Sequence, residues 1–263
     1  MVGIIKPLLY LTIINITICY AKKPKTIVGG TASKIEKHPH QVSIHWIDHF
    51  LCSGSIISQN HILSAASCIL FELGHIASNL KIIAGTNDKW NMLLLGQVKY
   101  VKYVIYHEEY NPHQQWKNDL AILRLESPIV ETRYSLKIKF WIRQIPLNII
   151  LSCTGWGDSY NNEGTETSRF LQSIQLNIEK QTTCERLIGG VLSLNQMCAE
   201  ILHYHSAITL GDGGNPIVAK KNYNEILLVG VVSVYSGDGS GRILIFTRLR
   251  LYDVWINNII KKY

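Results

Sequence analysis

Short runs of β-branched and aromatic residues recur along this chain, and Gly, Asn and Pro separate them. Examples are residues 41–46, 80–84 and 226–233. Runs of this length bounded by turn-forming residues are typical of β-strands. The exception is the end of the chain, where apolar residues recur at helical spacing over 252–262. The sequence therefore predicts an all-β fold that ends in an α-helix.

The N-terminal residues have the pattern of an export signal. Lys6 precedes an apolar run from Pro7 to Ile18, and small residues lead up to Ala21. The run is too short to span a bilayer comfortably. We therefore expect residues 1–21 to be a cleaved signal peptide and the mature protein to be secreted, extracellular and not held in a membrane.

The composition is that of a packed protein that is also basic. Of 263 residues, 47% are hydrophobic and 17% are charged, and the net charge of +7 falls by one when Lys6 leaves with the leader. An exported basic protein can adhere to sulfated glycans, so polyanion binding is one expectation. No nucleic-acid-binding motif is present, and nucleic acid is not an expected partner. The basic positions on which this expectation rests are Lys99, Lys102, Lys137, Lys139, Arg143, Lys220, Lys221, Lys261 and Lys262.

The chain has six cysteines, of which one lies in the leader. Cysteines in an oxidising compartment are expected to pair, and the odd number that remains leaves one thiol over. Their spacing includes no Cys-x-x-Cys and no nearby histidine pair, so we expect no metal site and no cofactor. The mature cysteines are Cys52, Cys68, Cys153, Cys184 and Cys198.

Several short motifs follow one another in a fixed order along the mature chain. They are IVGG at 27–30, LSAASC at 63–68, NDLAIL at 118–123 and GDGGNP at 211–216, with GWG at 155–157 and FTR at 246–248. Each motif alone is weak. In this order and at these separations, across nearly the whole mature chain, they resemble the chymotrypsin-like (trypsin-type) serine proteases.

The resemblance implies an architecture that agrees with the strand-rich pattern. The family has two six-stranded antiparallel β-barrels packed together, which would cover roughly residues 27–136 and 137–250, and a C-terminal helix at 252–262. Residues 22–26 would then be a short pro-segment, too short for an accessory domain.

The resemblance also locates the positions of the catalytic triad, in which a serine attacks, a histidine takes its proton and a buried aspartate holds the histidine. Asp119 matches the aspartate. Ser67 stands where the family pattern AAHC has histidine, and Gly213 stands where GDSGGP has its nucleophile. A hydroxyl is not a general base near neutral pH, and glycine has no nucleophile. We expect a catalytically inactive homologue, with nearby His61 a packed residue rather than a substitute base.

Four further positions correspond to the substrate pocket of the family. Ala207 takes the place of the acidic residue that gives trypsin-like members their basic specificity. After Ser233, Tyr235 and Leu244 stand where active members commonly have glycine. We expect these bulky side chains to fill the slot, the alternative being a different alignment of a loop whose length varies.

Asp212 and Ile27 correspond to the family's activation ion pair, in which the aspartate receives the new α-ammonium group. Burying the charged aspartate without the α-ammonium group would be costly in free energy. Ile27 follows Thr26, whereas trypsin-like activators cut after Lys or Arg, and Lys25 lies one residue too early. We expect an uncut chain with Asp212 bonded locally, although retention of Asp212 also suits cleavage.

The disulfide pairing is implied by the resemblance as Cys52–Cys68 and Cys184–Cys198. The bridge beside the nucleophile loop is missing, with Thr209 and Asp238 in place of its cysteines. Cys153 has no evident partner, and it is either a buried free thiol or the site of an intermolecular disulfide.

Binding is therefore the expected function. Secreted non-catalytic members of the family, particularly in arthropods, act as cofactors, decoys or inhibitors in protease cascades of clotting, immunity or venom. The expected partners are extracellular proteases, zymogens or their substrates. Two alternatives remain, a serine endopeptidase with residual activity and a basic protein that binds polyanions such as sulfated glycans.

Overall fold

The structure is a computed structural model of the chain. It describes residues 30–70, 76–88, 91, 95–156, 158–161, 164–167, 169–202, 212–222, 225–235 and 242–263, and at 158–161, 164–167, 222, 234 and 235 it describes the backbone alone.

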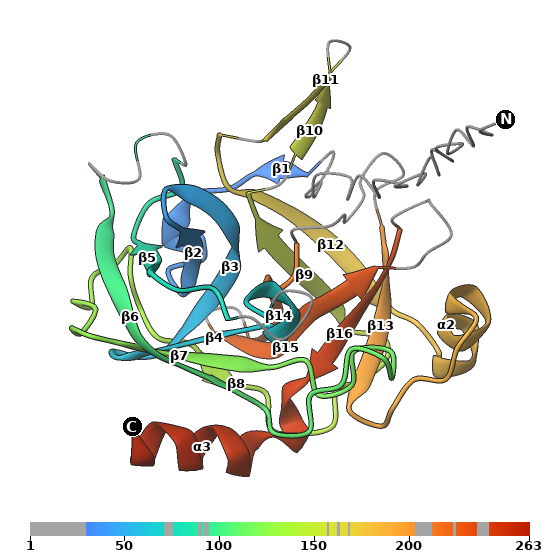
Figure 1. The fold of residues 1–263 in the computed structure, drawn as a ribbon. Coiled ribbons are helices and arrows are strands. Elements are labelled where there is room, and N and C mark those ends of the chain that lie inside the picture. The colour runs from blue at the N-terminus through green and yellow to red at the C-terminus, as the bar shows by residue number, and fades with distance from the viewer. Residues whose placement is uncertain are drawn as a thin grey trace, which may run out of the picture.

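The first half of the chain forms a closed antiparallel barrel in the order β2-β3-β4-β7-β6-β5 (Figure 1). β-branched residues such as Val42, Ile44, Ile62 and Ile82 fill its interior because they alternate inward along their strands. The strands are β2 Gln41–Trp46, β3 His49–Ser58, β4 His61–Ser64, β5 Leu80–Ala84, β6 Gln97–Tyr106 and β7 Ala121–Leu125.

The second half forms another closed six-stranded barrel, because β12 pairs with both β9 and β13 in a sheet that otherwise runs β13-β16-β15-β14-β9. The strands are β9 Ile150–Gly155, β12 Gln172–Ile178, β13 Gln196–Ile201, β14 Pro216–Asn222, β15 Glu225–Tyr235 and β16 Ile243–Arg248. The two-barrel fold expected from the sequence is confirmed.

Shorter elements decorate the barrels. The strands are β1 Thr31–Ala32 on β12, β8 Lys139–Phe140 on β15, and the hairpin of β10 Asp158–Asn161 with β11 Gly164–Thr167. The helices are η1 Ile35–Lys37, η2 Ala66–Cys68, α2 Gln181–Ile188, η4 Leu249–Leu251 and α3 Asp253–Lys262. Helix α3 therefore occupies the segment expected to be helical.

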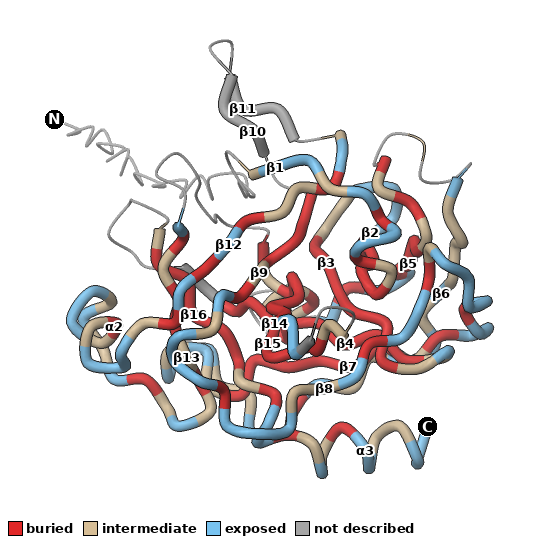
Figure 2. Tube along the Cα trace, turned by 180° about the vertical axis from the view of Figure 1, so that it is seen from behind, coloured by how far each residue is buried: buried red, intermediate tan, exposed pale blue. Residues whose placement is uncertain are grey.

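An apolar cluster joins the barrels to each other and to α3. Leu63 and Leu120 come from the first barrel, Val231 comes from the second, and Ile256 comes from α3. All four are fully buried, and Figure 2 shows the buried residues as a continuous band through both barrels. This contact fixes the end of β4 and the start of β7 against the second barrel.

The segment before β2 crosses from one barrel to the other. β1 pairs with β12, while the Ile56 amide donates to the His40 carbonyl oxygen (2.8 Å) in the first barrel. The His38 and His40 side chains are buried along this crossing. Burial lowers the pKa of His38 to about 4, helped by Lys37 and Lys220, and lowers that of His40 to about 3.

These two histidines predict an acid-sensitive stability. Because their native pKa values lie below the unfolded value near 6.5, the unfolded chain binds more protons between about pH 6.5 and pH 4. The contribution of these two histidines to the free energy of unfolding is fully present above pH 6.5. It falls as the pH drops, by about 1.4 kcal/mol per pH unit for each histidine. Urea unfolding across this range measures the slope.

The variant His38→Gln with His40→Gln is expected to reduce that slope, whereas His49→Gln, at an exposed position, serves as the control. An unchanged slope in the double variant, or titration of either native imidazole near pH 6.5 by NMR, would contradict this prediction.

Candidate functional site

Three segments meet where the barrels join. Helix η2 follows β4 and carries Ser67, the residues before β7 carry Asp119, and the turn before β14 carries Gly213. The Ser67 hydroxyl lies 2.7 Å from an Asp119 carboxylate oxygen, and a side chain added at Gly213 would place its Cβ 3.9 Å from Ser67 Oγ. The structure thus brings the three triad-equivalent positions together.

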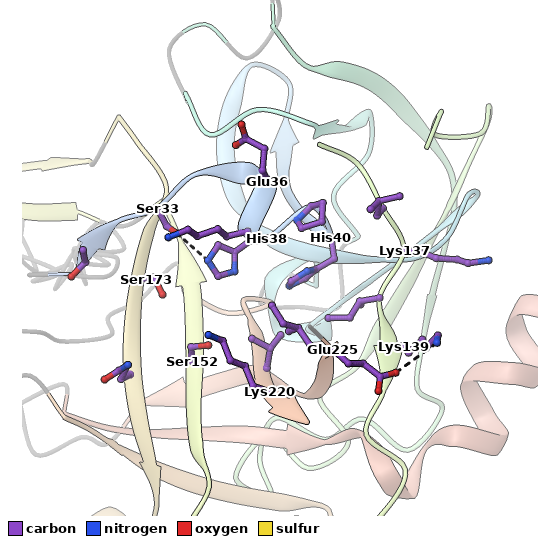
Figure 3. Close-up of a pocket in the computed structure, with 18 of the residues that line it drawn as sticks. Ser33, Glu36, His38, His40, Lys137, Lys139, Ser152, Ser173, Lys220 and Glu225 are labelled. Atoms are coloured by element: carbon purple, nitrogen blue, oxygen red, sulfur yellow. Dashed lines mark hydrogen bonds and ion pairs between the residues drawn. The ribbon is translucent and has the colours of Figure 1, made fainter. Parts of the chain in front are cut away.

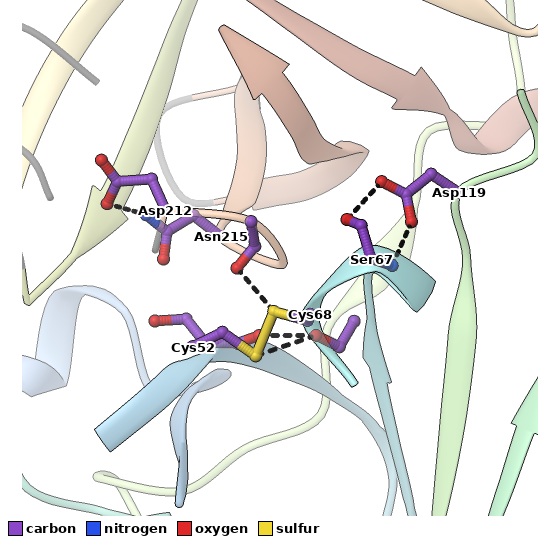
Figure 4. The surroundings of a disulfide bond; sticks show 9 residues. Cys52, Ser67, Cys68, Asp119, Asp212 and Asn215 are labelled. Carbon is purple, nitrogen blue, oxygen red and sulfur yellow. Dashed lines mark hydrogen bonds between the residues drawn. A yellow bond between two sulfur atoms is a disulfide. The ribbon is translucent and has the colours of Figure 1, made fainter. Parts of the chain in front are cut away.

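Asp119 is fully buried, and its carboxylate is satisfied by neutral donors (Figure 4). One oxygen accepts from the Ser67 amide (2.7 Å), and the other accepts from the Ser67 and Ser233 hydroxyls. Burial raises the pKa of Asp119, and these hydrogen bonds oppose the rise. Among the described residues, no histidine is hydrogen-bonded to this carboxylate.

This arrangement leaves no activated nucleophile at the described positions. The Ser67 hydroxyl donates its proton to a carboxylate, which is far too weak a base to deprotonate an alcohol. His61 is not hydrogen-bonded to Asp119; its Nδ1 instead lies 2.7 Å from Ser58 Oγ at the end of β3.

The turn Asp212–Asn215 keeps its backbone path through hydrogen bonds to β15. The Gly214 amide donates to the Val232 carbonyl oxygen (2.8 Å), and the Val232 amide donates to the Asn215 carbonyl oxygen (2.9 Å). Gly214 has a φ of +82°, and a Cβ there would overlap the Ser53 carbonyl oxygen. Glycine is therefore required at 214.

Gly213 is under no such requirement. It has no positive φ, and an added Cβ would lie 3.6 Å from its nearest neighbour, Cys68 Sγ, at ordinary van der Waals distance. The Cys68 sulfur also lies 3.1 Å from the Gly213 carbonyl oxygen. The backbone therefore does not require glycine at 213.

Asp212 is buried and has a local partner. The Asn215 amide group donates to an Asp212 carboxylate oxygen (3.0 Å). Asn215 stands where the family pattern has its second glycine, and it fits because Gly155 beside it has no side chain. Ile27, the other expected partner of Asp212, lies outside the described residues.

The pocket-equivalent positions fall in different surroundings. Ser233 points its hydroxyl at Asp119. Leu244 is fully buried in the core of the second barrel, in the cluster that includes Val232 and Ile201. Ala207 and the Tyr235 side chain lie outside the described residues, as do Thr209 and Asp238, so the filled slot stays a prediction.

The cysteines pair as the resemblance implied. Cys52 bonds to Cys68 and Cys184 bonds to Cys198, with Cα separations of 6.2 and 6.3 Å. Cys153 is a free thiol that is fully buried in β9, and burial, with the nearby charge of Asp212, raises its pKa well above the usual value. A protonated and enclosed thiol does not reach another chain.

Two negative observations concern the described part of the chain only. No three or more His, Cys, Asp or Glu side chains in it gather as metal ligands would. None of its helices combines the length and the apolar character needed to cross a membrane.

Sequence reasoning missed the roles of Ser233 and Asn215. Ser233 was recognised only as a pocket position, and its bond to Asp119 spans 114 residues. The asparagine within GDGGNP was a visible departure from the family pattern, and it was the one signal available for Asn215.

The adjacent glycines provide a matched pair of substitutions. Gly214→Ala is expected to destabilise the protein by about 3 kcal/mol or more, because the Cβ meets backbone and the φ is strained. Gly213→Ala is expected to change the free energy of unfolding by less than about 1 kcal/mol. Urea unfolding measures both, and equal losses would contradict the assignment of Gly213 as a position free to carry a side chain.

Comparison with known proteins agrees with this geometry. A sequence model of the Trypsin family matches residues 27–256. A protein named trypsin from Sarcophaga bullata is 32% identical over 219 residues, which cover 80% of this chain and 79% of the relative. Trypsin zeta of Drosophila erecta is 29% identical (79% and 75% covered), and Trypsin-1 of Salmo salar is 25% identical (93% and 95% covered). Together with the two barrels and the meeting of the segments that carry Ser67, Asp119 and Gly213, these matches show that the chain belongs to the trypsin family of chymotrypsin-like serine proteases.

Proposed function

We propose that this protein is a secreted, non-catalytic member of the trypsin family that acts by binding, as a cofactor or competitor in an extracellular protease cascade. One observation carries the proposal. The Asp119 carboxylate is occupied by the Ser67 and Ser233 hydroxyls, and the adjoining position that should present a nucleophile is Gly213.

The chemistry of peptide hydrolysis needs both missing groups. A general base must take the proton of the attacking hydroxyl and return it to the leaving amine. Ser67 offers no basic lone pair near neutral pH, and Gly213 offers no atom to bond to the substrate carbonyl. An acyl-enzyme therefore has no route through these positions.

What is retained supports a binding role. Both barrels, the Cys52–Cys68 and Cys184–Cys198 disulfides, and the turn at Gly214 maintain the shape of a protease. A chain of that shape can still meet the surfaces by which proteases find cofactors and substrates. The leader at 1–21 and the disulfides support export, since disulfides persist in oxidising compartments.

The first test is for hydrolysis. The purified protein is expected to cleave peptide esters and amides about 10⁶-fold more slowly than an active family member, because the triad contributes a factor of this order. It is also expected to remain unlabelled by a serine-directed phosphonate. Hydrolysis that such a phosphonate abolishes would instead support the endopeptidase alternative.

A restored variant serves as the control for that test. Gly213→Ser should fold, because the added Cβ has room. The combination of Ser67→His with Gly213→Ser is still expected not to cleave after arginine, because Ala207 offers no carboxylate for the guanidinium group. Efficient cleavage after arginine would show that this view of the pocket is wrong.

The second test is for action on a cascade. The protein is added at increasing concentration to a reconstituted clotting or melanisation cascade from the source organism. We expect the rate of the cascade to rise steadily if the protein is a cofactor, or to fall steadily if it is a competitor. A basic protein of equal charge and different fold is the control for unspecific effects. The absence of any change, together with no co-purifying protease, would overturn the cofactor or competitor role.

A further inference from the structure

A second concave site lies where the crossing segment before β2 spans the two barrels (Figure 3). It is a groove of about 1010 Å³, and none of the triad-equivalent residues lines it. The crossing segment forms one wall, residues 136–139 form another, and side chains of β9, β12, β14 and β15 complete it.

Lysines dominate the charge of this groove. Lys37, Lys137, Lys139 and Lys220 line it, against Glu36 and Glu225. Glu225 is already neutralised, because Lys139 (3.7 Å) and Lys221 (3.2 Å) both pair with it.

The other three lysines have no such neutralising partner in the described part of the chain. Lys37, Lys137 and Lys220 form no ion pair with a carboxylate there. Lys37 and Lys220 lie near enough to His38 to lower its pKa together. The charges of Lys37 and Lys220 therefore converge on the same end of the groove, where they are available to an anionic ligand.

Two buried ring nitrogens in the groove have no hydrogen-bond partner among the described atoms. They are Nε2 of His40, a residue 3% exposed, and Nδ1 of His38, whose Nε2 lies 3.0 Å from Ser33 Oγ. Leaving a buried polar atom unpaired costs about 1–3 kcal/mol, and such atoms in native proteins usually have a reason. Both atoms are closed to solvent, so they offer a ligand in the groove no direct contact.

Apolar side chains lie between the lysines. Leu136 is 40% exposed, and Pro39 and Ile226 are partly exposed beside it. β1 also lines the groove, and it is the terminal strand of its sheet, so one of its edges pairs with no strand in the described part of the chain. An extended peptide can use such an edge and such apolar contacts, whereas a sulfated glycan has no aliphatic side chains for Leu136.

We propose that this groove binds an extended acidic segment of a partner protein. Carboxylates of the segment pair with Lys37, Lys137 and Lys220, and its aliphatic side chains pack on Leu136 and Ile226. The proposal rests on the proposed function in that it gives the binding protein a docking surface. It does not depend on catalytic silence.

Fluorescence anisotropy with the full-length mature protein tests this groove. The probe is a fluorescein-labelled peptide that alternates glutamate with leucine, which places the carboxylates on one side of an extended chain. A peptide that alternates glutamine with leucine is the matched control. We expect the glutamate peptide to bind and the glutamine peptide to bind at least about tenfold more weakly.

Charge reversal locates the contact. Lys137→Glu with Lys220→Glu is expected to weaken binding of the glutamate peptide by about tenfold or more. Lys102→Glu with Lys180→Glu makes the same change in net charge at exposed positions outside the groove and is expected to leave binding unchanged. Equal weakening by both pairs, or equal binding of both peptides, would overturn the proposal.

Two further outcomes separate this inference from its alternatives. A heparin oligosaccharide that binds more tightly than the glutamate peptide, with the same dependence on Lys137 and Lys220, would show that the groove takes sulfated glycans and that the peptide assignment is wrong. A cascade effect that survives the Lys137 and Lys220 reversals unchanged would overturn the groove as docking surface and leave the proposed function standing. Binding of the glutamate peptide without any effect on the cascade would overturn the proposed function and leave the groove as a peptide-binding site.

Discussion

A carboxylate buried between two barrels has to be satisfied, and the surroundings of Asp119 are organised by that requirement. Its carboxylate oxygens accept hydrogen bonds from the Ser67 amide and hydroxyl in the first barrel and from the Ser233 hydroxyl in the second. The Thr247 hydroxyl donates to the backbone carbonyl oxygen of Asp119 (3.3 Å). Removing one donor would leave this buried carboxylate less well satisfied, because the remaining donors would have to stabilise it alone. Serine at 67 therefore supplies hydrogen bonds that a buried carboxylate at 119 requires.

The region around this carboxylate and the groove differ in chemical character. Around Asp119 the backbone geometry is intact, down to a turn that only glycine can make at 214, and the reactive groups are missing. The groove instead has cationic and apolar side chains in one concavity. The junction of the two barrels thus has a concave surface that is separate from the triad-equivalent positions.

Local patterns predicted the elements, and long-range contacts limited the prediction of the sites. Residues 41–46 and 80–84 became β2 and β5 because their side chains suit a pleated surface, and the spacing of Trp255, Ile256 and Ile259 specified α3. The bond from Ser233 to Asp119 has no local signature. The nine basic residues treated as one set also divide in space, with Lys137 and Lys220 at the groove and Lys102 on β6. The sequence did not single out Lys37, because Lys37 follows Glu36 in the short helix η1 and the two charges cancel.

The enclosure of Cys153 has a consequence for how the chain acquires its two disulfides. In the unfolded chain this thiol is as available as the other four, and any exchange that captures it leaves a native partner unpaired. Once β9 is inserted between β12 and β14, the thiol is withdrawn from solvent and held protonated, so it neither attacks nor is attacked. Closure of the second barrel thus withdraws Cys153 from disulfide exchange, whereas any pairing that precedes closure has this fifth sulfur within the reach of the four native ones.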